Sequence, residues 1–338
     1  MKTIFITGGA GFIGSNFIRH ISAKYGKIKI INFDKLTYAG LSKKFENLGP
    51  KTKYYFIRGD IADMARLKSA FLKYKPQYVI NFAAETHVDR SIHGNIRDFV
   101  RTNVEGVFNI LKLVKTSPFV KKFLQISTDE VYGALSLAGG KKFNEKSPLL
   151  PNSPYAASKA GADMLCRSFF STWGIPVVVS RSSNNYGPFQ YPEKLIPYFV
   201  SRALRKKTLP LYGDGKNVRD WVYVLDNCRA LELCLFKGRP GEIYNVGAGE
   251  EKSNLEIAGT LLRHFNLDPS FLSFVDDRPG HDRRYALDSS KIRRELGWRP
   301  RHSFDEAFAA TVAWYASPPN YWISRTENIS LNSHIKTS

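Results

Sequence analysis

Tyr155 and Lys159 stand four residues apart and form the side-chain pair whose chemistry is easiest to state. Ser153 suits a helix N-cap and Pro154 the first helical position, so the pair should share one face of a helix over 155–173. A free phenol has a pKa of about 10, and a neighbouring positive charge lowers it. The pair therefore indicates proton transfer to or from a hydroxyl, although an isolated pair with this spacing is usually ordinary surface.

Two adjacent carboxylates follow a short apolar run. Phe123–Ser127 is typical of a strand, and Thr128, Asp129 and Glu130 come directly after it. The hydroxyl of Thr128, or of the serine before it, can hydrogen-bond the substrate hydroxyl that Tyr155 deprotonates. Two carboxyl groups in one pocket can hold different protonation states and serve as acid and base. Without this context, such a pair is more often an exposed acidic loop.

A glycine-rich loop stands near the start of the chain. Gly8, Gly11 and Gly14 follow the apolar run Ile4–Thr7 and open the helical pattern Phe12–Ala23. Glycines let a backbone approach a pyrophosphate, and the helix N-terminus adds amides and partial positive charge. A strand, a glycine loop and a helix in this order predict a dinucleotide site.

Asp34 ends the second apolar run, Lys29–Phe33, and lies 20 residues after Gly14. A carboxylate there accepts hydrogen bonds from the adenine ribose and repels a 2′-phosphate, which favours NAD over NADP. Lys35 beside it weakens this argument, and a purely structural turn cap remains an alternative. Asp60, after the third strand, can accept a hydrogen bond from the adenine amino group.

Strands and helices alternate through the first half of the chain, which predicts βαβ units and a parallel sheet with ligands at the carboxyl ends of its strands. We therefore expect an α/β fold, a Rossmann-type doubly wound parallel sheet with a smaller C-terminal substrate-binding lobe. The expected strands are Ile4–Thr7, Lys29–Phe33, Tyr54–Ile57, Tyr78–Ala84, Phe123–Ser127 and Val177–Arg181, and the expected helices are Phe12–Ala23, Val100–Val114 and Tyr155–Trp173.

The pattern loosens beyond residue 182, where prolines punctuate shorter elements. We expect a dinucleotide-binding domain over 1–182, an interleaved substrate lobe over 183–322 and a polar tail over 323–338. A helix at Asp220–Phe236 and a strand at Glu242–Val246 should return to the first domain within about 217–250.

The chain carries 50 Lys and Arg against 30 Asp and Glu, a net charge of +20, but its basic residues are spread out. This argues against a nucleic-acid tail and for solvated surface that attracts phosphate-bearing ligands. Three cysteines without a C-x-x-C pair, no stretch of about 20 apolar residues and a start that reads as a strand predict a cytoplasmic protein without membrane spans. His87 and Asp89 lack a third ligand at metal spacing, so no metal is expected.

The chain resembles the dTDP-glucose 4,6-dehydratases, members of the extended short-chain dehydrogenase/reductase superfamily, from residue 1 to about 315. The Thr128-Asp129-Glu130 triplet separates these dehydratases from related 4-epimerases. The resemblance is carried by Gly8–Gly14, Asp34–Gly40, Ala83–Ser91, Ser127–Gly133, Tyr155–Lys159, Ser183–Pro188, Tyr191–Pro197, Arg219–Trp221 and Asp277–Tyr285.

The resemblance implies a hydro-lyase of deoxysugar biosynthesis that uses NAD. Tyr155 would remove the C4 hydroxyl proton as hydride passes from C4 to NAD, with Thr128 orienting the hydroxyl and Lys159 assisting. Glu130 would then abstract the C5 proton and Asp129 would protonate the departing C6 hydroxyl. Hydride return to C6 and reprotonation of C5 would give a 4-keto-6-deoxy sugar nucleotide.

The resemblance also implies the binding residues and a homodimer, with 100–114 and 155–173 as interface helices. Arg219 and Arg278 suit a diphosphate clamp, because guanidinium matches phosphate bidentately. Expected around the cofactor are Gly8, Gly11, Phe12, Ile13, Gly14, Asp34, Lys35, Leu36, Thr37, Asp60, Ile61, Ala83, Ala84, Thr102, Tyr155, Lys159 and Asn185. Expected around the substrate are Thr86, Thr128, Asn184, Lys194, Leu195, Arg219, Asn254, Arg278 and His281.

Two alternative functions stay open at this point. A UDP-glucose 4,6-dehydratase or a nucleotide-sugar 4-epimerase would have the same fold. A non-catalytic nucleotide-binding or nucleic-acid-binding protein could use the positive charge, but the intact Tyr155/Lys159 and Asp129/Glu130 pairs argue against it.

Overall fold

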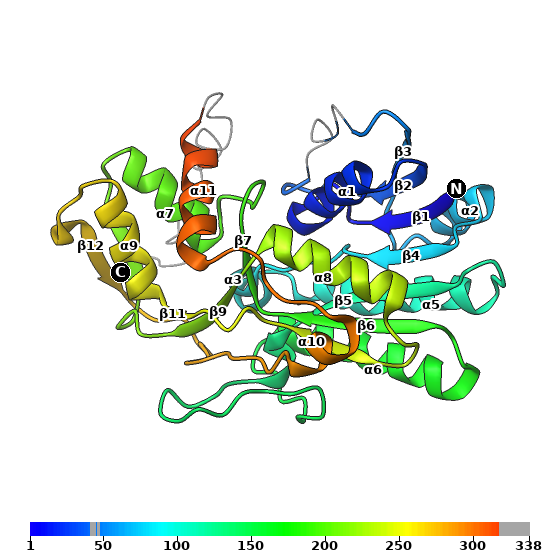
Figure 1. Ribbon diagram of the computed structural model, residues 1–338. Coiled ribbons are helices and arrows are strands. Elements are labelled where there is room, and N and C mark those ends of the chain that lie inside the picture. Colours follow the sequence, from blue (N-terminus) through cyan, green and yellow to red (C-terminus); the bar gives the residue numbers. More distant parts are fainter. Residues whose placement is uncertain (41–44, 46–47, 318–338) are drawn as a thin grey trace.

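A seven-stranded sheet forms the centre of the computed structural model, which describes residues 1–40, 45 and 48–317 (Figure 1). Its strand order is β10-β6-β5-β4-β1-β2-β3, and every neighbouring pair is parallel. The strands are β1 (Lys2–Thr7), β2 (Ile28–Asp34), β3 (Thr52–Arg58), β4 (Tyr78–Asn81), β5 (Lys122–Thr128), β6 (Val177–Ser182) and β10 (Ile243–Val246). The predicted doubly wound parallel fold is confirmed. The tail expected over 323–338 lies outside the described residues.

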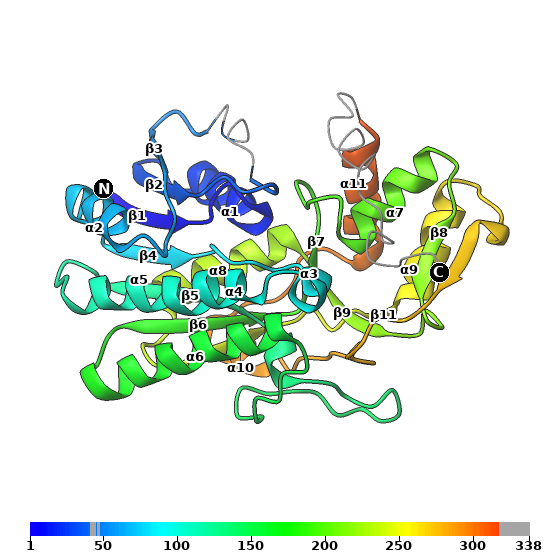
Figure 2. The same cartoon turned by 180° about the vertical axis from the view of Figure 1, so that it is seen from behind.

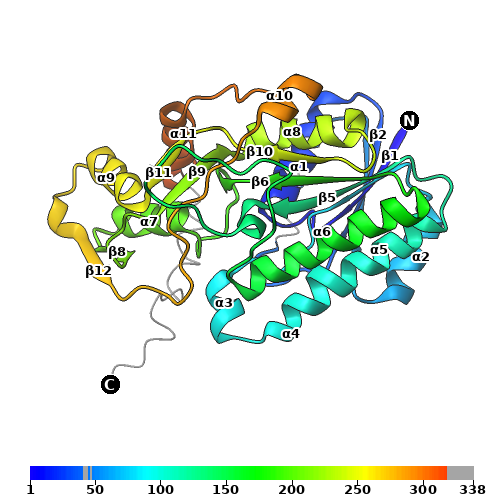
Figure 3. The ribbon, with the colours of Figure 1, turned by 90° about the horizontal axis from the view of Figure 1, so that it is seen from below.

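Helices cover both faces of this sheet because its central strands are apolar on both faces (Figure 3). In β1, Ile4 and Ile6 belong to the core shared with α1 and α8, whereas Phe5 packs on Phe71 of α2 with ring centroids 5.5 Å apart. The helices on the first face are α1 (Phe12–Lys24) and α8 (Val224–Lys237), and those on the second are α2 (Met64–Tyr74), α5 (Gly106–Lys115) and α6 (Pro154–Trp173).

Shorter helical segments lie between β4 and α5. They are α3 (Val88–His93), α4 (Ile96–Phe99) and the π-helical segment η2 (Val100–Glu105). The helix expected over 100–114 is therefore π-helical in its first part, and such a segment often lies at a functional site. Among the described residues, no helix has both the length and the apolarity to cross a bilayer.

The second lobe is smaller and built from local elements (Figure 2). A three-stranded sheet of order β11-β9-β7 joins it to the large sheet, and β12 and β8 form a parallel pair. Its elements are β7 (Asn184–Tyr186), α7 (Leu195–Leu204), β8 (Leu209–Tyr212), β9 (Val218–Tyr223), β11 (Glu251–Ser253), α9 (Asn254–His264), η4 (Pro269–Phe271), β12 (Leu272–Val275) and α11 (Phe304–Ala316).

The chain crosses back to the first lobe after β9. It runs through α8 to β10, which pairs in parallel with β6, and α10 (Ser290–Leu296) packs beside them. We keep the division into 1–182 and an interleaved 183–322, with a return over 217–250, as a proposal.

Two expected elements were wrong in their bounds. The helix expected from Asp220 begins at Val224, because 220–223 complete β9, where Trp221-Val222-Tyr223 suit a strand paired on both sides. The strand expected over Tyr78–Ala84 ends at Asn81, since the following residues line a pocket instead of continuing the ladder.

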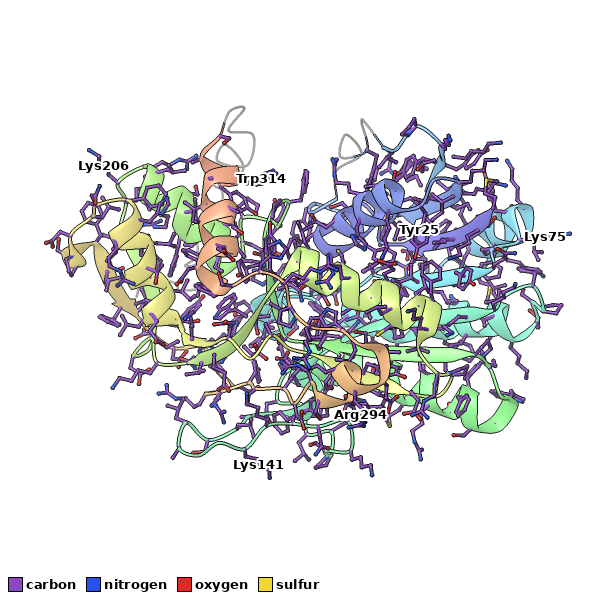
Figure 4. The ribbon with its side chains drawn as sticks, viewed as in Figure 1. Tyr25, Lys75, Lys141, Lys206, Arg294 and Trp314 are labelled. Atoms are coloured by element: carbon purple, nitrogen blue, oxygen red, sulfur yellow. The ribbon has the colours of Figure 1, made fainter. Side chains whose placement is uncertain are left out.

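A buried carboxylate joins α1 to α8, two helices from distant parts of the chain. Glu232 accepts hydrogen bonds from Tyr25 Oη at 2.6 Å, His20 Nε2 at 2.7 Å and Lys24 Nζ at 2.9 Å. Figure 4 labels Tyr25 at the end of α1, next to α8. Burial alone would raise the pKa of Glu232, but its hydrogen bonds from His20, Lys24 and Tyr25 lower it to about 2.

We predict that E232Q lowers the free energy of unfolding at pH 7 by roughly 2 kcal/mol. The folded pKa lies below the ordinary value of 4.5, so the charged carboxylate stabilises the fold above about pH 4.5 and loses this effect as pH falls toward 2. Urea unfolding from pH 7 to pH 3 should show the difference from wild type shrinking. The exposed Glu105 supplies the control: E105Q should change stability by less than about 0.5 kcal/mol. Equal effects of both variants at pH 7 would contradict this role.

Candidate active site

A cavity of about 330 Å³ opens where the large sheet's strands end. Residues after β1, β2, β3, β4, β5 and β6 line it, and it lies beside the β1–β4 neighbours, where the strand order reverses. Ligands bind at this position in open α/β sheets.

The glycine loop lines the cavity, and at two of its glycines a side chain would overlap neighbouring atoms. Gly8 has a φ of +66°, and a Cβ placed on it would lie 2.4 Å from Ala83 N. A Cβ on Gly14 would lie 2.6 Å from Gly8 O. Gly11 is the N-cap of α1, and no described side chain caps it. No side chain of these glycines stands between the backbone and the cavity, so the amides at the helix N-terminus are accessible to a dinucleotide pyrophosphate.

Asp34 both holds a turn and faces the cavity. Its Oδ2 accepts a hydrogen bond from Ala10 N and its Oδ1 from Leu36 N, each at 2.8 Å. The structural cap that the sequence left open is therefore present, and the carboxylate also lines the cavity. Leu36, with a φ of +55°, is the one expected cofactor residue that does not line the cavity.

The cation next to Asp34 has a partner of its own. Lys35 Nζ lies 3.0 Å from Asp60 Oδ2, and Arg101 Nη2 lies 3.3 Å from the same oxygen. Burial would raise the pKa of Asp60, but its hydrogen bonds from Ala62 and Lys35 and both cations lower it. Because Lys35 pairs with Asp60, its charge is less available to attract a 2′-phosphate.

Tyr155 and Lys159 project from α6 into the same cavity. The predicted helix start is confirmed: Ser153 is the N-cap and accepts a hydrogen bond from Ala156 N, and Pro154 is the first residue. Lys159 Nζ donates to Ile126 O at 2.6 Å. Burial lowers the pKa of Lys159 to about 8, against the opposing charge of a carboxylate on the next turn of α6.

The pKa of Tyr155 moves in the direction opposite to the one expected from its lysine neighbour. Burial raises it most, and the carboxylate of Glu130 raises it further, while a hydrogen bond with Thr128 acts against them. The protein's own residues therefore keep the phenol protonated. A cationic ligand ring beside it would act in the direction that a base requires.

The two carboxylates lie on η3 (Asp129–Tyr132), a 3-10 turn that starts where β5 ends. Thr128 Oγ1 accepts a hydrogen bond from Glu130 N at 3.3 Å and lies 3.1 Å from Asp129 Oδ1. Asp129 is 1% exposed, and its buried Oδ2 has no hydrogen-bond partner among the described residues.

Asp129 and Glu130 have different surroundings and therefore differ in how strongly each carboxyl group holds its proton. Burial raises the pKa of Asp129 well above its ordinary value, and Glu130 adds to the shift. Burial also raises the pKa of Glu130, but Arg278, Arg219 and Lys194 oppose it. The arrangement favours a protonated Asp129 beside a Glu130 that more readily loses its proton.

A second cavity of about 180 Å³ continues from the first into the small lobe. Its lining includes the expected substrate residues other than Thr128, which lines the first cavity. The two cavities meet at residues that line both: Thr86, Glu130, Asn184, Glu193 and Lys194.

Arg219 is the unusual cation of the second cavity. It is 5% exposed, and its guanidinium donates to the carbonyls of Val218 and Asp282 at 2.8 and 3.0 Å. Within the described chain no carboxylate forms an ion pair with it. Arg278 pairs with Asp89 at 3.0 Å, but its buried Nε has no hydrogen-bond partner in the part of the chain that the structure describes. Both guanidinium groups thus retain donors suited to an anion.

Several residues of the site escaped the sequence analysis. Tyr38 Oη donates to Glu193 Oε1 at 3.0 Å, and Tyr38 packs edge-on against Tyr191 with ring centroids 5.2 Å apart. These loops meet over the junction of the cavities. The two loops belong to Asp34–Gly40 and Tyr191–Pro197, which carry the family resemblance. The one sequence signal for these side chains was a nearby glycine in the first loop and a proline in the second.

The fold and these two cavities define the class: a dinucleotide-dependent short-chain dehydrogenase/reductase of the extended type. A family model described as GDP-mannose 4,6 dehydratase matches residues 5–311. A dTDP-glucose 4,6-dehydratase of Xanthomonas campestris is 46% identical over 332 residues, covering 93% of each chain.

Solved structures agree with the sequence relatives. A dTDP-glucose 4,6-dehydratase of Streptomyces venezuelae, crystallised with NAD, has a TM-score of 0.89 at 45% identity and covers 95% of this chain and 98% of its own. That of Bacillus anthracis, also in complex with NAD, has a TM-score of 0.88 at 44% identity, with 95% and 99% covered. The chain belongs to the dTDP-glucose 4,6-dehydratase family.

We predict that G14A weakens dinucleotide binding by at least about tenfold, because the added methyl group would overlap Gly8 O. Titration with NAD, followed by quenching of tryptophan fluorescence, measures the affinity. G259A is the control: in α9 its Cβ would meet only Arg263 Nη1 at 3.7 Å, so affinity should be unchanged and stability should rise by roughly 0.5–1 kcal/mol. Unaltered NAD affinity in G14A would remove the glycine loop from the binding site.

Proposed function

We propose that the protein converts dTDP-glucose to dTDP-4-keto-6-deoxyglucose and water, with NAD as a regenerated cofactor. One observation carries the proposal: a buried phenol and amine face the first cavity together with two adjacent carboxyl groups, and one of these, Glu130, also lines the second cavity. A redox site alone would not need the pair. A 4-epimerase would have no use for it, which favours the dehydratase.

The first step is oxidation at C4 of the hexose. Bound NAD would supply the reversible hydride acceptor that this oxidation and the later reduction at C6 require. Tyr155 takes the C4 hydroxyl proton, and Thr128 orients that hydroxyl. Lys159, whose Nζ donates to the carbonyl of Ile126 and which lines the same cavity as Tyr155, would bind the cofactor there and add positive charge that favours the phenolate.

The second step is loss of water across C5 and C6. The C4 ketone acidifies the C5 hydrogen, which Glu130 removes as a base. Asp129, kept protonated by burial, gives its proton to the departing C6 hydroxyl, which leaves as water. Glu130 then returns its proton to C5 once C6 has been reduced. Tyr155 ends the reaction holding the C4 hydroxyl proton and Asp129 ends it ionised, so one proton must pass from the phenol to Asp129 through solvent before the next turnover.

The second cavity suits the nucleoside diphosphate. Arg219 and Arg278 provide guanidinium donors for the two phosphates, and no carboxylate among the described residues forms an ion pair with Arg219. The lining deeper in the small lobe is apolar and aromatic, with Phe199, Leu211 and Tyr212, as a nucleobase requires. Thymine and uracil differ by one methyl group, so assays with both nucleotides decide between dTDP-glucose and UDP-glucose.

We further propose that the enzyme is a homodimer in the cytoplasm. The helices on the α5–α6 face expose apolar side chains: Ile96 is 47% exposed, Val100 51%, Phe108 39%, Met164 44% and Trp173 49%. An apolar face of this kind marks an interface more often than plain surface. Three buried, unpaired cysteines suit a reducing compartment.

We predict that D129N and E130Q each lower product formation at least about 100-fold, while C4 oxidation persists. The loss follows because elimination needs both an acid and a base, whereas oxidation relies on Tyr155. Reduced cofactor is followed by absorbance at 340 nm, and the 4-keto product by its alkali-induced absorbance, with wild type as reference. Normal water loss in either variant would refute the role of that carboxyl group.

A second prediction concerns assembly. V100D combined with M164K should convert a dimer into a monomer, because each change places a charge on the apolar helix face. Sedimentation equilibrium measures the mass. The control is F274K on β12, where the phenylalanine is 59% exposed on the other lobe and the mass should not change. A monomeric wild-type protein, or a dimer that survives the double change, would contradict the proposed interface.

A further inference from the structure

We propose that a buried network through Asp163, Arg181 and Tyr132 fixes the acid/base turn η3 relative to the redox helix α6. Tyr132 is then a positioning residue for the elimination step. The inference rests on the proposed function, since it assigns separate steps to α6 and η3.

The network starts on the face of α6 that carries the redox pair. Asp163 lies one turn after Lys159 and two turns after Tyr155 on that face. It is 1% exposed, and its Oδ2 accepts hydrogen bonds from Ser127 Oγ at 3.0 Å and Arg181 Nε at 2.8 Å. Asp163 thus ties α6 to the strand β5 that delivers the acid/base pair and to its neighbour β6.

From Arg181 the network reaches the far end of η3. Arg181 Nη1 donates to Tyr132 Oη at 2.9 Å, and this hydroxyl donates to Asn245 Oδ1 on β10 at 2.8 Å. The Tyr132 ring stacks on Phe143, with centroids 5.0 Å apart and planes 17° from parallel. Tyr132 is the last residue of η3 and stands two residues after Glu130. Both ends of the turn are therefore anchored, by Thr128 at its start and by Tyr132 at its finish.

The energetics make this network rigid. Arg181 is 1% exposed, and the ion pair that the described residues give it is with Asp163. A buried cation whose donors lose their acceptors is strongly destabilised, so the three side chains cannot shift independently. None of these atoms touches the cavities: Asp163, Arg181 and Tyr132 are absent from both linings. The network therefore acts through the residues it holds.

Position matters most for the second step. The same hexose must present C4 to Tyr155 on α6, and C5 and C6 to the carboxyl groups on η3. Misplacement by about 1 Å can cost up to about 100-fold in rate. A network that joins the two elements keeps both distances correct at once.

The test uses Y132F, which removes one hydroxyl and keeps the ring. Oxidation is measured alone with dTDP-6-deoxyglucose, which can be oxidised at C4 but has no C6 hydroxyl to lose; reduced cofactor is read at 340 nm. Elimination is measured with dTDP-glucose as 4-keto-6-deoxy product. We expect oxidation within twofold of wild type and product formation lowered about tenfold. NAD affinity, read by fluorescence quenching, should not change.

Y244F is the matched control. Tyr244 is fully buried on β10, and its hydroxyl bonds Glu295 at 3.1 Å, away from both cavities. It should lower the melting temperature by about as much as Y132F and leave the ratio of the two rates unchanged. A ratio shifted equally in both variants, or unshifted in Y132F, would overturn the proposal.

A second variant tests the same network in case Y132F does not fold. N245S removes the acceptor of the Tyr132 hydroxyl and should reproduce the altered ratio in a weaker form. If neither variant folds, the network is a folding requirement and the positioning role is withdrawn. A wild-type protein that makes no 4-keto-6-deoxy product would instead defeat the proposed function, so the two failures are distinguishable.

Discussion

Two adjacent carboxyl groups, of which Asp129 is only 1% exposed, repel each other when both are ionised, and residues of both lobes offset that cost. Asp129 avoids the penalty by staying protonated, whereas Glu130 faces three cations, Arg278, Arg219 and Lys194. Those cations come from the small lobe, while the carboxyl groups come from the end of β5. The small lobe therefore supplies the positive charge that opposes the rise in the pKa of Glu130.

The first and second cavities also share part of their lining. Glu130 and Lys194 line both, so a ligand in one cavity changes the field felt in the other. In the absence of ligands, burial and carboxylates keep the phenol of Tyr155 protonated. Deprotonation then depends on what fills the first cavity, which ties base activation to occupancy by a cationic ring.

Residues at strand ends were the ones that the sequence made visible. Apolar runs closed by Gly8, Asp34 or Thr128 mark both the strand and the edge where ligands bind, so the parallel sheet and the position of the cavity follow from periodicity. Most of the individual lining residues were expected only from the family resemblance. The roles of these residues needed the family resemblance, because a Tyr-Lys spacing or a carboxylate pair is common on ordinary surfaces. Leu36 has a positive φ and does not line the cavity, so its place beside the cofactor stays a prediction.

Other features leave no local trace in the sequence. The Asp163–Arg181 pair joins residues on different elements, and Tyr38 meets Glu193 only once two distant loops are folded together. The pKa direction of Tyr155 was missed for a related reason: the lysine is visible at i+4, but burial is a property of the packed structure. Long-range contacts and desolvation thus set the limit of what spacing can reveal.

The return of the chain to complete the sheet has a consequence during synthesis. β10 and α8 are needed on the outer edge and one face of the sheet, yet they leave the ribosome only after residues 224–246 are made. Until then α1 lacks the glutamate that receives its three hydrogen bonds, and apolar helix surface stays uncovered. The first lobe therefore stays incomplete until this later part of the chain has been synthesised. During that time its exposed apolar surface makes it most prone to aggregation and most dependent on chaperones.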